Sequence, residues 1–285
     1  GSRDPGSNPG RPTKGFSVEI GQFEGTLPLC INMGDDRSPE GDPEARIQWR
    51  AKQLEKHSDL YYNRAEPEIS DAEFDSLRDE LQSLSPEHDQ LSRVGSDPPP
   101  GSEKVNHLFR MMSLDKATSE AEVAHFVSET TANGRRFVCQ PKLDGSALSL
   151  EYRRGRLLRA ATRGNGRRGE DVTANVRRMM NVPENLSWKG DCHVRGEVVM
   201  PLQIFREKYS DVAPNPRNLA AGALRQKYVD AGKGRPEDLK FLAYGVEFPR
   251  GQDRHPDSQR PPDFKLDSEV ISWISGLGIE AAGNH

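Results

Sequence analysis

The sequence contains few cysteines and no long apolar run. Its 285 residues include only three cysteines, Cys30, Cys139 and Cys192, and no C-x-x-C pair. Three scattered cysteines support neither a disulfide framework nor a zinc ribbon. No stretch approaches the roughly 18 apolar residues of a membrane span, and the N-terminus lacks the basic-then-apolar layout of a secretory signal. We therefore expect a cytoplasmic protein that does not contact a membrane.

An excess of positive charge is also missing. The chain has 40 Lys and Arg against 44 Asp and Glu, a net charge of -4, which argues against general electrostatic attraction to nucleic acid. Arginine pairs occur locally at 153–154, 167–168 and 177–178, but such pairs are mostly solvated surface. With 33% hydrophobic residues, the chain can bury one core and a second, smaller one.

The chain divides by composition into three segments. Residues 1–43 are rich in Gly, Pro, Ser and Asp and have no sustained period, which predicts a flexible leader with at most a short strand near "FSVEI". Residues 44–95 repeat apolar positions at helical spacing in two runs, and Ser70 and Glu73 have the spacing of a capping box at the start of the second. We expect a helical hairpin here, followed by the linker "DPPPGSEK" and a third segment, residues 96–285.

The third segment predicts one helix followed by strands. "SEAEVAHFVSET" favours a short helix, whereas "RRFVCQPKLDG", "SALSLEYRRGRLLRAATRG" and "DCHVRGEVVMP" read as strands bounded by Gly and Pro. The middle pattern predicts an antiparallel hairpin that turns at Arg154-Gly155.

A glycine motif, "GNGRRG" at 164–169, has the G-x-G-x-x-G spacing of a dinucleotide-binding Rossmann turn and precedes a predicted helix, "DVTANVRRMM". A Rossmann entry strand is buried on both faces and reads as a continuous apolar run in a parallel sheet. The strand before this motif alternates, pairs with its predecessor, and is followed by the charged "RRGED". The motif therefore does not indicate a Rossmann fold.

Several charged motifs, taken together, indicate a functional site. Lys142-Leu143-Asp144-Gly145 is a short K-x-D-G match that means little alone. It is followed in order by "TRGNGRRGEDVTANVR", "VRGEV" and "NPRNLAAGALRQ", in which charged residues are held between Gly or Pro. Such strand ends favour a pocket for a phosphorylated molecule.

These motifs, in this order, resemble those of bacterial NAD-dependent DNA ligases over the stretch from about Glu44 to Gly245. The resemblance implies an α+β fold: a helical subdomain (44–95) that binds nicotinamide mononucleotide, then an antiparallel-sheet nucleotidyltransferase (adenylation) domain (96–285) of the ATP-grasp-like DNA ligase and mRNA-capping type. It implies NAD as a consumed adenylyl donor, Mg²⁺, nicked duplex DNA as partner, and a monomer associated with the bacterial nucleoid.

The resemblance also implies catalytic roles. Lys142 would attack the adenylyl phosphorus of NAD, and Asp144 would orient the amine or hold a Mg²⁺-bound water. A free lysine amine is mostly protonated at neutral pH, so we expect burial and neighbouring cations to activate it.

Other residues would bind the nucleotide. By the family pattern Arg163 contacts its ribose or phosphate, Glu197 holds the ribose hydroxyls, and Arg217 and Arg225 neighbour the nucleotide or the DNA 5′-phosphate. Ser113-Leu114 would lie beside the adenine.

In the helical hairpin Tyr61, Asp71 and Asp75 would grip the mononucleotide half of NAD. Without the resemblance, the two acids read as solvated residues near a helix N-terminus. Three positions depart from the family pattern: Gln140 replaces a Glu, Tyr62 a His and Phe74 a Tyr. We expect adenine recognition through Gln140 to be weaker but similar, because a carboxamide oxygen still accepts hydrogen bonds.

Later motifs of the family do not appear before His285. The lysine-bearing "DGVVIK"-like strand, the oligonucleotide-binding barrel, the four-cysteine zinc site, the helix-hairpin-helix array and the BRCT module are missing, and "SEVISWISGLGIEAAGNH" predicts a helix and a turn that lead toward strands. We expect an adenylation domain that is incomplete at its C-terminus and at most self-adenylates. The alternatives are a non-catalytic NAD-binding relic and an ATP-dependent polynucleotide ligase.

Overall fold

The computed structural model describes residues 42–61, 67–93, 95–97, 102–112, 117, 119–131, 138–227 and 233–283. The expected leader, apart from its last two residues, lies outside these ranges. No helix in the described ranges is long and apolar enough to cross a lipid bilayer.

The first elements form the expected helical hairpin. Helix α1 (Pro43–Asp59) and helix α2 (Asp71–Leu84) contact each other, and the short α3 (Asp89–Ser92) contacts both. The capping box before α2 is confirmed: the Ser70 backbone N–H donates to Glu73 Oε2 over 2.8 Å, and the Glu73 N–H donates to Ser70 Oγ over 3.3 Å. Two backbone donors at the start of the helix are thus satisfied locally, which fixes where α2 begins.

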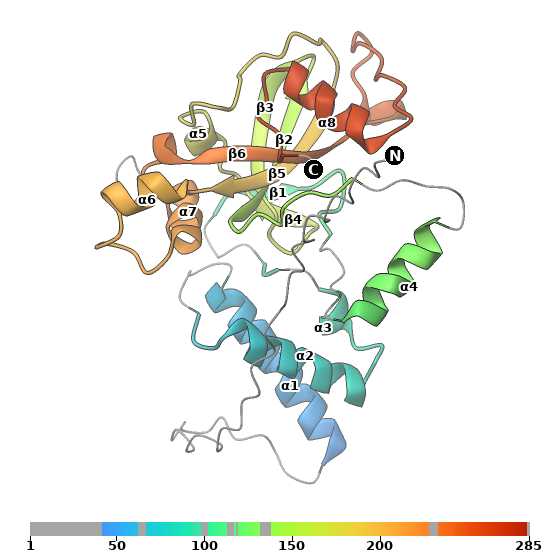
Figure 1. The fold of residues 1–285 in the computed structure, drawn as a ribbon, viewed down its shortest axis with the longest axis vertical. Helices are drawn as coiled ribbons and strands as arrows, with labels where there is room; N and C mark the ends of the chain where they lie inside the picture. Colours follow the sequence, from blue (N-terminus) through green and yellow to red (C-terminus); the bar gives the residue numbers. More distant parts are fainter. Residues whose placement is uncertain are drawn as a thin grey trace, which may run out of the picture. The chain divides into compact units, whose positions relative to one another are not determined.

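The main sheet has four strands in the order β3-β2-β5-β6, and every neighbouring pair is antiparallel (Figure 1). Its strands are β2 (Ser146–Arg153), β3 (Arg156–Thr162), β5 (Cys192–Val199) and β6 (Lys240–Glu247).

The hairpin predicted at Arg154-Gly155 joins β2 to β3 and is confirmed. Both turn residues have positive φ, 49° and 75°, as a tight two-residue β-hairpin requires when its twist matches that of the strands.

The strand expected over "RRFVCQPKLDG" is wrong for the residues that are described. Residues 138–144 form neither helix nor strand, and β2 begins only at Ser146. Pro141 lacks the N–H that a central strand donates to its neighbour. Gly145 then brings the chain against β5, since a Cβ there would lie 2.1 Å from the Val198 carbonyl oxygen.

A second, two-stranded sheet lies beside the glycine motif. Strand β1 (Lys104–Asn106) pairs antiparallel with β4 (Arg168–Glu170). The helix expected after the linker is α4 (Glu120–Thr131).

The helix predicted over "DVTANVRRMM" is only the four-residue α5 (Thr173–Val176). It is followed by bonds between residues three apart, Arg178 N–H to Asn175 O, Met179 N–H to Val176 O and Val182 N–H to Met179 O. Tight turns of this type bring Val176, Met179 and Val182 into the core.

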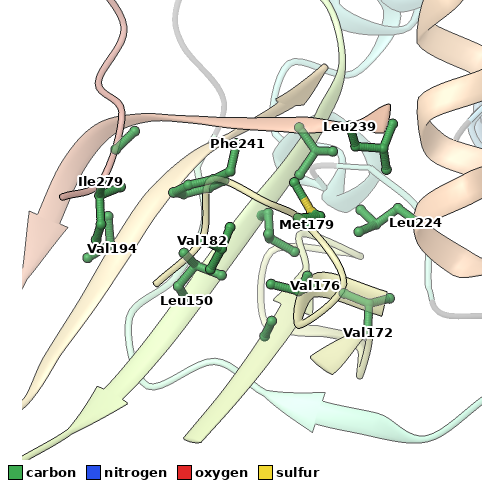
Figure 2. Close-up of a cluster of buried hydrophobic side chains, with 14 of the residues drawn as sticks. Leu150, Val172, Val176, Met179, Val182, Val194, Leu224, Leu239, Phe241 and Ile279 are labelled. Atoms are coloured by element: carbon green, nitrogen blue, oxygen red, sulfur yellow. The ribbon is translucent and has the colours of Figure 1, made fainter. Parts of the chain in front are cut away.

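The core packs between the sheet and the segments that follow α5. The remaining helices are α6 (Leu202–Lys208), α7 (Pro216–Arg225) and α8 (Asp267–Gly276), with 3₁₀ turns at Pro236–Asp238 and Gly251–Asp253. Figure 2 shows part of the core, which includes Leu150, Val172, Val176, Met179, Val182, Val194, Leu224, Leu239, Phe241 and Ile279.

After α8 the chain returns to the edge of the sheet. The Ala243 N–H donates to Glu280 O over 2.9 Å, and the Ala282 N–H donates to Ala243 O over 2.7 Å. The predicted helix and turn are therefore followed by a parallel bridge to β6.

Candidate functional site

Four charged side chains lie around the carboxyl group of Glu197, which is near the C-terminal end of β5. Burial raises the pKa of Glu197 to about 7, against the charges of Arg163, Arg217 and Lys142, which lower it, while Asp144 raises it further. These groups come from the segment before β2, the end of β3, β5 and α7. The fold thus brings together five of the residues that the sequence motifs single out.

Lys142 and Asp144 lie in the irregular segment that precedes β2, and both side chains are exposed. The expectation that Lys142 is buried is therefore wrong. The following residue, Gly145, is buried against the Val198 carbonyl, where no larger residue fits. This close approach fixes the segment next to β5, and so places Lys142 near Glu197.

Arg217 joins three parts of the site. Its Nη1 donates to Asp144 Oδ1 over 2.8 Å, and its Cζ lies 4.3 Å from the centroid of the Tyr61 ring. The arginine sits in the first turn of α7, which Asn215 caps by accepting the Asn218 N–H over 2.8 Å. A cation over an aromatic face is an attractive geometry, so Tyr61 belongs to the same cluster.

Arg163 lies directly after β3 and immediately before the glycine motif. Gly164 and Gly166 have φ of 55° and 82°, and Asn165 Oδ1 accepts the N–H groups of Arg167 and Arg168 over 2.9 and 2.8 Å. The motif is a compact turn between β3 and the antiparallel β4 region. This arrangement confirms that it is not a Rossmann turn, because no helix rises from it and no parallel sheet precedes it.

Tyr244 joins the site although sequence reasoning missed it. The register between β5 and β6 shifts at Arg195/Gly196, which face Gly245 and Ala243, so Tyr244 has no partner across the pair. The side chain is 40% exposed, and burial of its hydroxyl together with the charge of Glu197 raises the pKa of Tyr244. Bulges of this kind re-aim side chains near functional sites; the one sequence signal is a glycine inside a strand, Gly245.

Arg225 and Gln140 have protein partners. Arg225 Nε lies 3.2 Å from Glu170 Oε2; burial lowers the pKa of Arg225 and raises that of Glu170. Gln140 Nε2 donates to Ala282 O over 3.3 Å, which links the segment before Lys142 to the bridge that follows α8.

Of the remaining predicted site residues, the structure describes only some. Asp75 is half-buried on α2. Asp71 is the first residue of that helix, but its side chain lies outside the description, as do Ser113, Leu114 and Tyr62. Among the described residues, no group of three or more His, Cys, Asp or Glu side chains could hold a metal ion.

Comparison with known proteins agrees with the motifs. Residues 101–278 match the family described as the NAD-dependent DNA ligase adenylation domain. Residues 40–99 match the DNA ligase-like, N-terminal NAD⁺-binding domain.

Curated relatives named DNA ligase are similar over most of the chain. The protein of Bradyrhizobium sp. strain BTAi1 is 40% identical over 261 residues, and that of Rhodopseudomonas palustris strain TIE-1 is 42% identical over 261 residues. Each alignment covers 83% of this chain and 35% of the relative, so the chain spans about a third of the length of these proteins. The predicted resemblance is confirmed, and the chain belongs to the NAD-dependent DNA ligase family.

Proposed function

We propose that this chain carries out the adenylyl transfer that begins NAD-dependent DNA ligation. The observation that supports this best is the convergence of Lys142, Asp144, Arg163 and Arg217 on Glu197. A nucleophilic amine beside two guanidinium groups suits attack on a phosphate, because the cations can stabilise the charge that grows on its oxygens.

The reaction balances as one substitution at phosphorus. The Lys142 Nζ lone pair forms the N–P bond, and the bond from that phosphorus to the bridging oxygen of the pyrophosphate breaks. Nicotinamide mononucleotide leaves with the electron pair on its phosphate oxygen, and the nitrogen keeps one proton and gives the others to solvent. Lys142 is exposed, so water can accept them directly.

The nucleotide would be held by groups on either side of the reacting phosphorus. Glu197 would accept hydrogen bonds from the ribose hydroxyls, and Arg163 would contact the ribose or phosphate. Arg217 and Arg225 would neighbour the nucleotide or the DNA 5′-phosphate. Ser113, Leu114 and Gln140 are proposed for the adenine. Tyr61, Asp71 and Asp75 are proposed for the mononucleotide half, which the contact between Tyr61 and Arg217 supports.

Mg²⁺ fits this donor set. The ion prefers oxygen ligands, keeps several waters, and binds through one or two carboxylates together with substrate phosphates. Asp144, which is exposed and lies in the same cluster as Lys142, supplies such a carboxylate. When bound, the ion would neutralise charge on the phosphate oxygens.

We further propose the finer assignments that the family suggests. These are an ATP-grasp-like nucleotidyltransferase fold for residues 96–285 and a mononucleotide-binding subdomain for residues 44–95. The matched ranges, 101–278 and 40–99, support this division. Sealing of 5′-phosphate/3′-hydroxyl nicks in duplex DNA, by a monomer at the bacterial nucleoid during replication and repair, is proposed as the outcome of the pathway that this step begins.

Adenylyl transfer can be tested with the chain as it is. Incubation with Mg²⁺ and NAD labelled in the adenylyl phosphate should label the protein and release one nicotinamide mononucleotide per label, whereas labelled ATP should transfer nothing. Lys142→Ala should abolish labelling, and Lys265→Ala, at an exposed lysine outside the cluster, should not. Labelling from ATP would instead support an ATP-dependent ligase. Saturable NAD binding by folded but unlabelled protein would support a non-catalytic binding module.

A further inference from the structure

A histidine outside the cluster contacts the backbone that carries Arg163. His107 Nε2 lies 3.0 Å from the Thr162 carbonyl oxygen and 3.2 Å from the Arg163 carbonyl oxygen. Because carbonyl oxygens only accept, Nε2 carries the proton and donates to both. Burial lowers the pKa of His107, so the ring is neutral at neutral pH and this tautomer is the one that fits.

The backbone around His107 holds the same turn from a second side. The His107 N–H donates to Arg167 O over 2.8 Å, and the Met111 N–H donates to Gly166 O over 2.9 Å. The segment from β1 to Met111 therefore follows the glycine motif along its length, and the imidazole closes the end from which Arg163 leaves β3.

Gly169 shows how closely these parts approach. A Cβ at this position would lie 1.7 Å from the Thr162 carbonyl oxygen and 3.0 Å from His107 Nε2. Only glycine allows β4 to lie this close to both the end of β3 and the imidazole. The third glycine of the motif thus makes room for the contact of His107 with β3.

We propose that His107 is a positioning residue for adenylyl transfer. It fixes the carbonyl groups of Thr162 and Arg163, and thereby the direction in which the Arg163 side chain leaves the sheet toward Glu197. Gly164, next in the chain, adopts a conformation with φ of 55° and offers no restraint of its own. This inference rests on the proposed function, since the reaction it serves is the labelling of Lys142.

A double-mutant cycle tests the inference. His107→Ala should lower the second-order rate constant of single-turnover labelling by NAD about tenfold, because small displacements of a positioning group are costly in rate. His107→Gln, whose amide can donate from nearly the same place, should recover most of the loss. In an Arg163→Ala background, His107→Ala should add less than about twofold, since residues that act through one another are not additive.

A matched control is His193→Gln, which removes another half-buried imidazole, one that packs edge-on against Phe109 at 5.2 Å. It should leave this rate constant within about twofold of the wild-type value. A full tenfold effect of His107→Ala in both backgrounds would overturn the inference and leave the proposed function standing.

Amide hydrogen exchange gives a readout that does not need activity. His107→Ala should speed exchange in residues 163–168 and leave β5 unchanged; unchanged exchange in 163–168 would also overturn the inference. A wild-type chain that takes no label, while His107→Ala still speeds this exchange, would contradict the proposed function. That result would still support the contact of His107 with the turn.

Discussion

Arg217 Nη1 and Asp144 Oδ1 are 2.8 Å apart, which ties the start of α7 to the segment that carries Lys142. The two residues are 73 positions apart in sequence. Their side chains are 27% and 69% exposed, and an exposed pair of this kind contributes at most about 1 kcal/mol to stability. The ion pair therefore matters less for stability than for geometry, because it holds a carboxylate and a cation beside the proposed nucleophile.

Replacing Arg217 should impair the reaction far more than the fold. Arg217→Ala should slow labelling of Lys142 by at least about tenfold, because the loss of one charge-stabilising donor typically costs a factor of 10² to 10³. The free energy of unfolding should change by less than about 1 kcal/mol. Single-turnover labelling and urea unfolding measure the two quantities, and Arg250→Ala, at an exposed residue outside the cluster, is the control. An unchanged labelling rate would remove Arg217 from the mechanism.

The raised pKa of Glu197 predicts a pH-dependent stability. Its pKa is about 7 in the folded chain against an ordinary value of 4.5, so between these values the folded state binds more protons than the unfolded state. Stability from this group is full below about pH 4.5 and is lost as the pH rises toward 7. Relative to Glu197→Gln, the wild type should lose on the order of 2 kcal/mol across this window. Urea unfolding of both proteins from pH 4.5 to 8 provides the measurement, and a constant difference would contradict burial of this carboxyl group.

The hairpin turn offers a test of backbone strain. Gly155 has φ of 75°, and a Cβ there would lie 2.4 Å from the Trp188 carbonyl oxygen. Gly155→Ala should therefore destabilise the chain by roughly 1–3 kcal/mol. Gly222→Ala is the matched control, since it lies inside α7 with no atom within 4 Å of the added Cβ, and it should stabilise by about 0.5–1 kcal/mol. Equal effects in thermal unfolding would show that the turn does not require glycine.

Truncating a buried side chain should destabilise the protein far more than truncating an exposed one. Phe241 is fully buried on β6, whereas Leu158 on β3 is 49% exposed. Phe241→Ala should cost about 3–5 kcal/mol, and Leu158→Ala should stay within about 0.5 kcal/mol. Chemical unfolding of both variants checks the expected contrast, and similar losses would mean that the sheet face assigned to the core is wrong.

Features set by neighbouring residues could be predicted from the sequence. The capping box at Ser70 and Glu73 and the turn at Arg154-Gly155 depend on contacts within a few positions, and both are confirmed. The alternating pattern beside that turn also excluded a parallel sheet correctly.

Features set by distant partners could not be predicted. The strand expected before Lys142 fails because Gly145 meets Val198, more than 50 positions away. Tyr244 was missed because its bulge exists only in the pairing of β6 with β5. Lys142 is exposed because it lies in the same irregular segment. Its proximity to Glu197 could be expected only from the family motifs.

The proposed function requires that the Lys142 amine become covalently bonded to phosphorus. The most direct measurement is peptide mass spectrometry of the chain after incubation with NAD and Mg²⁺. We expect one added AMP, carried by the peptide that contains Lys142 and bonded to its side-chain nitrogen. An AMP found on another residue, or a folded chain with none, would contradict it.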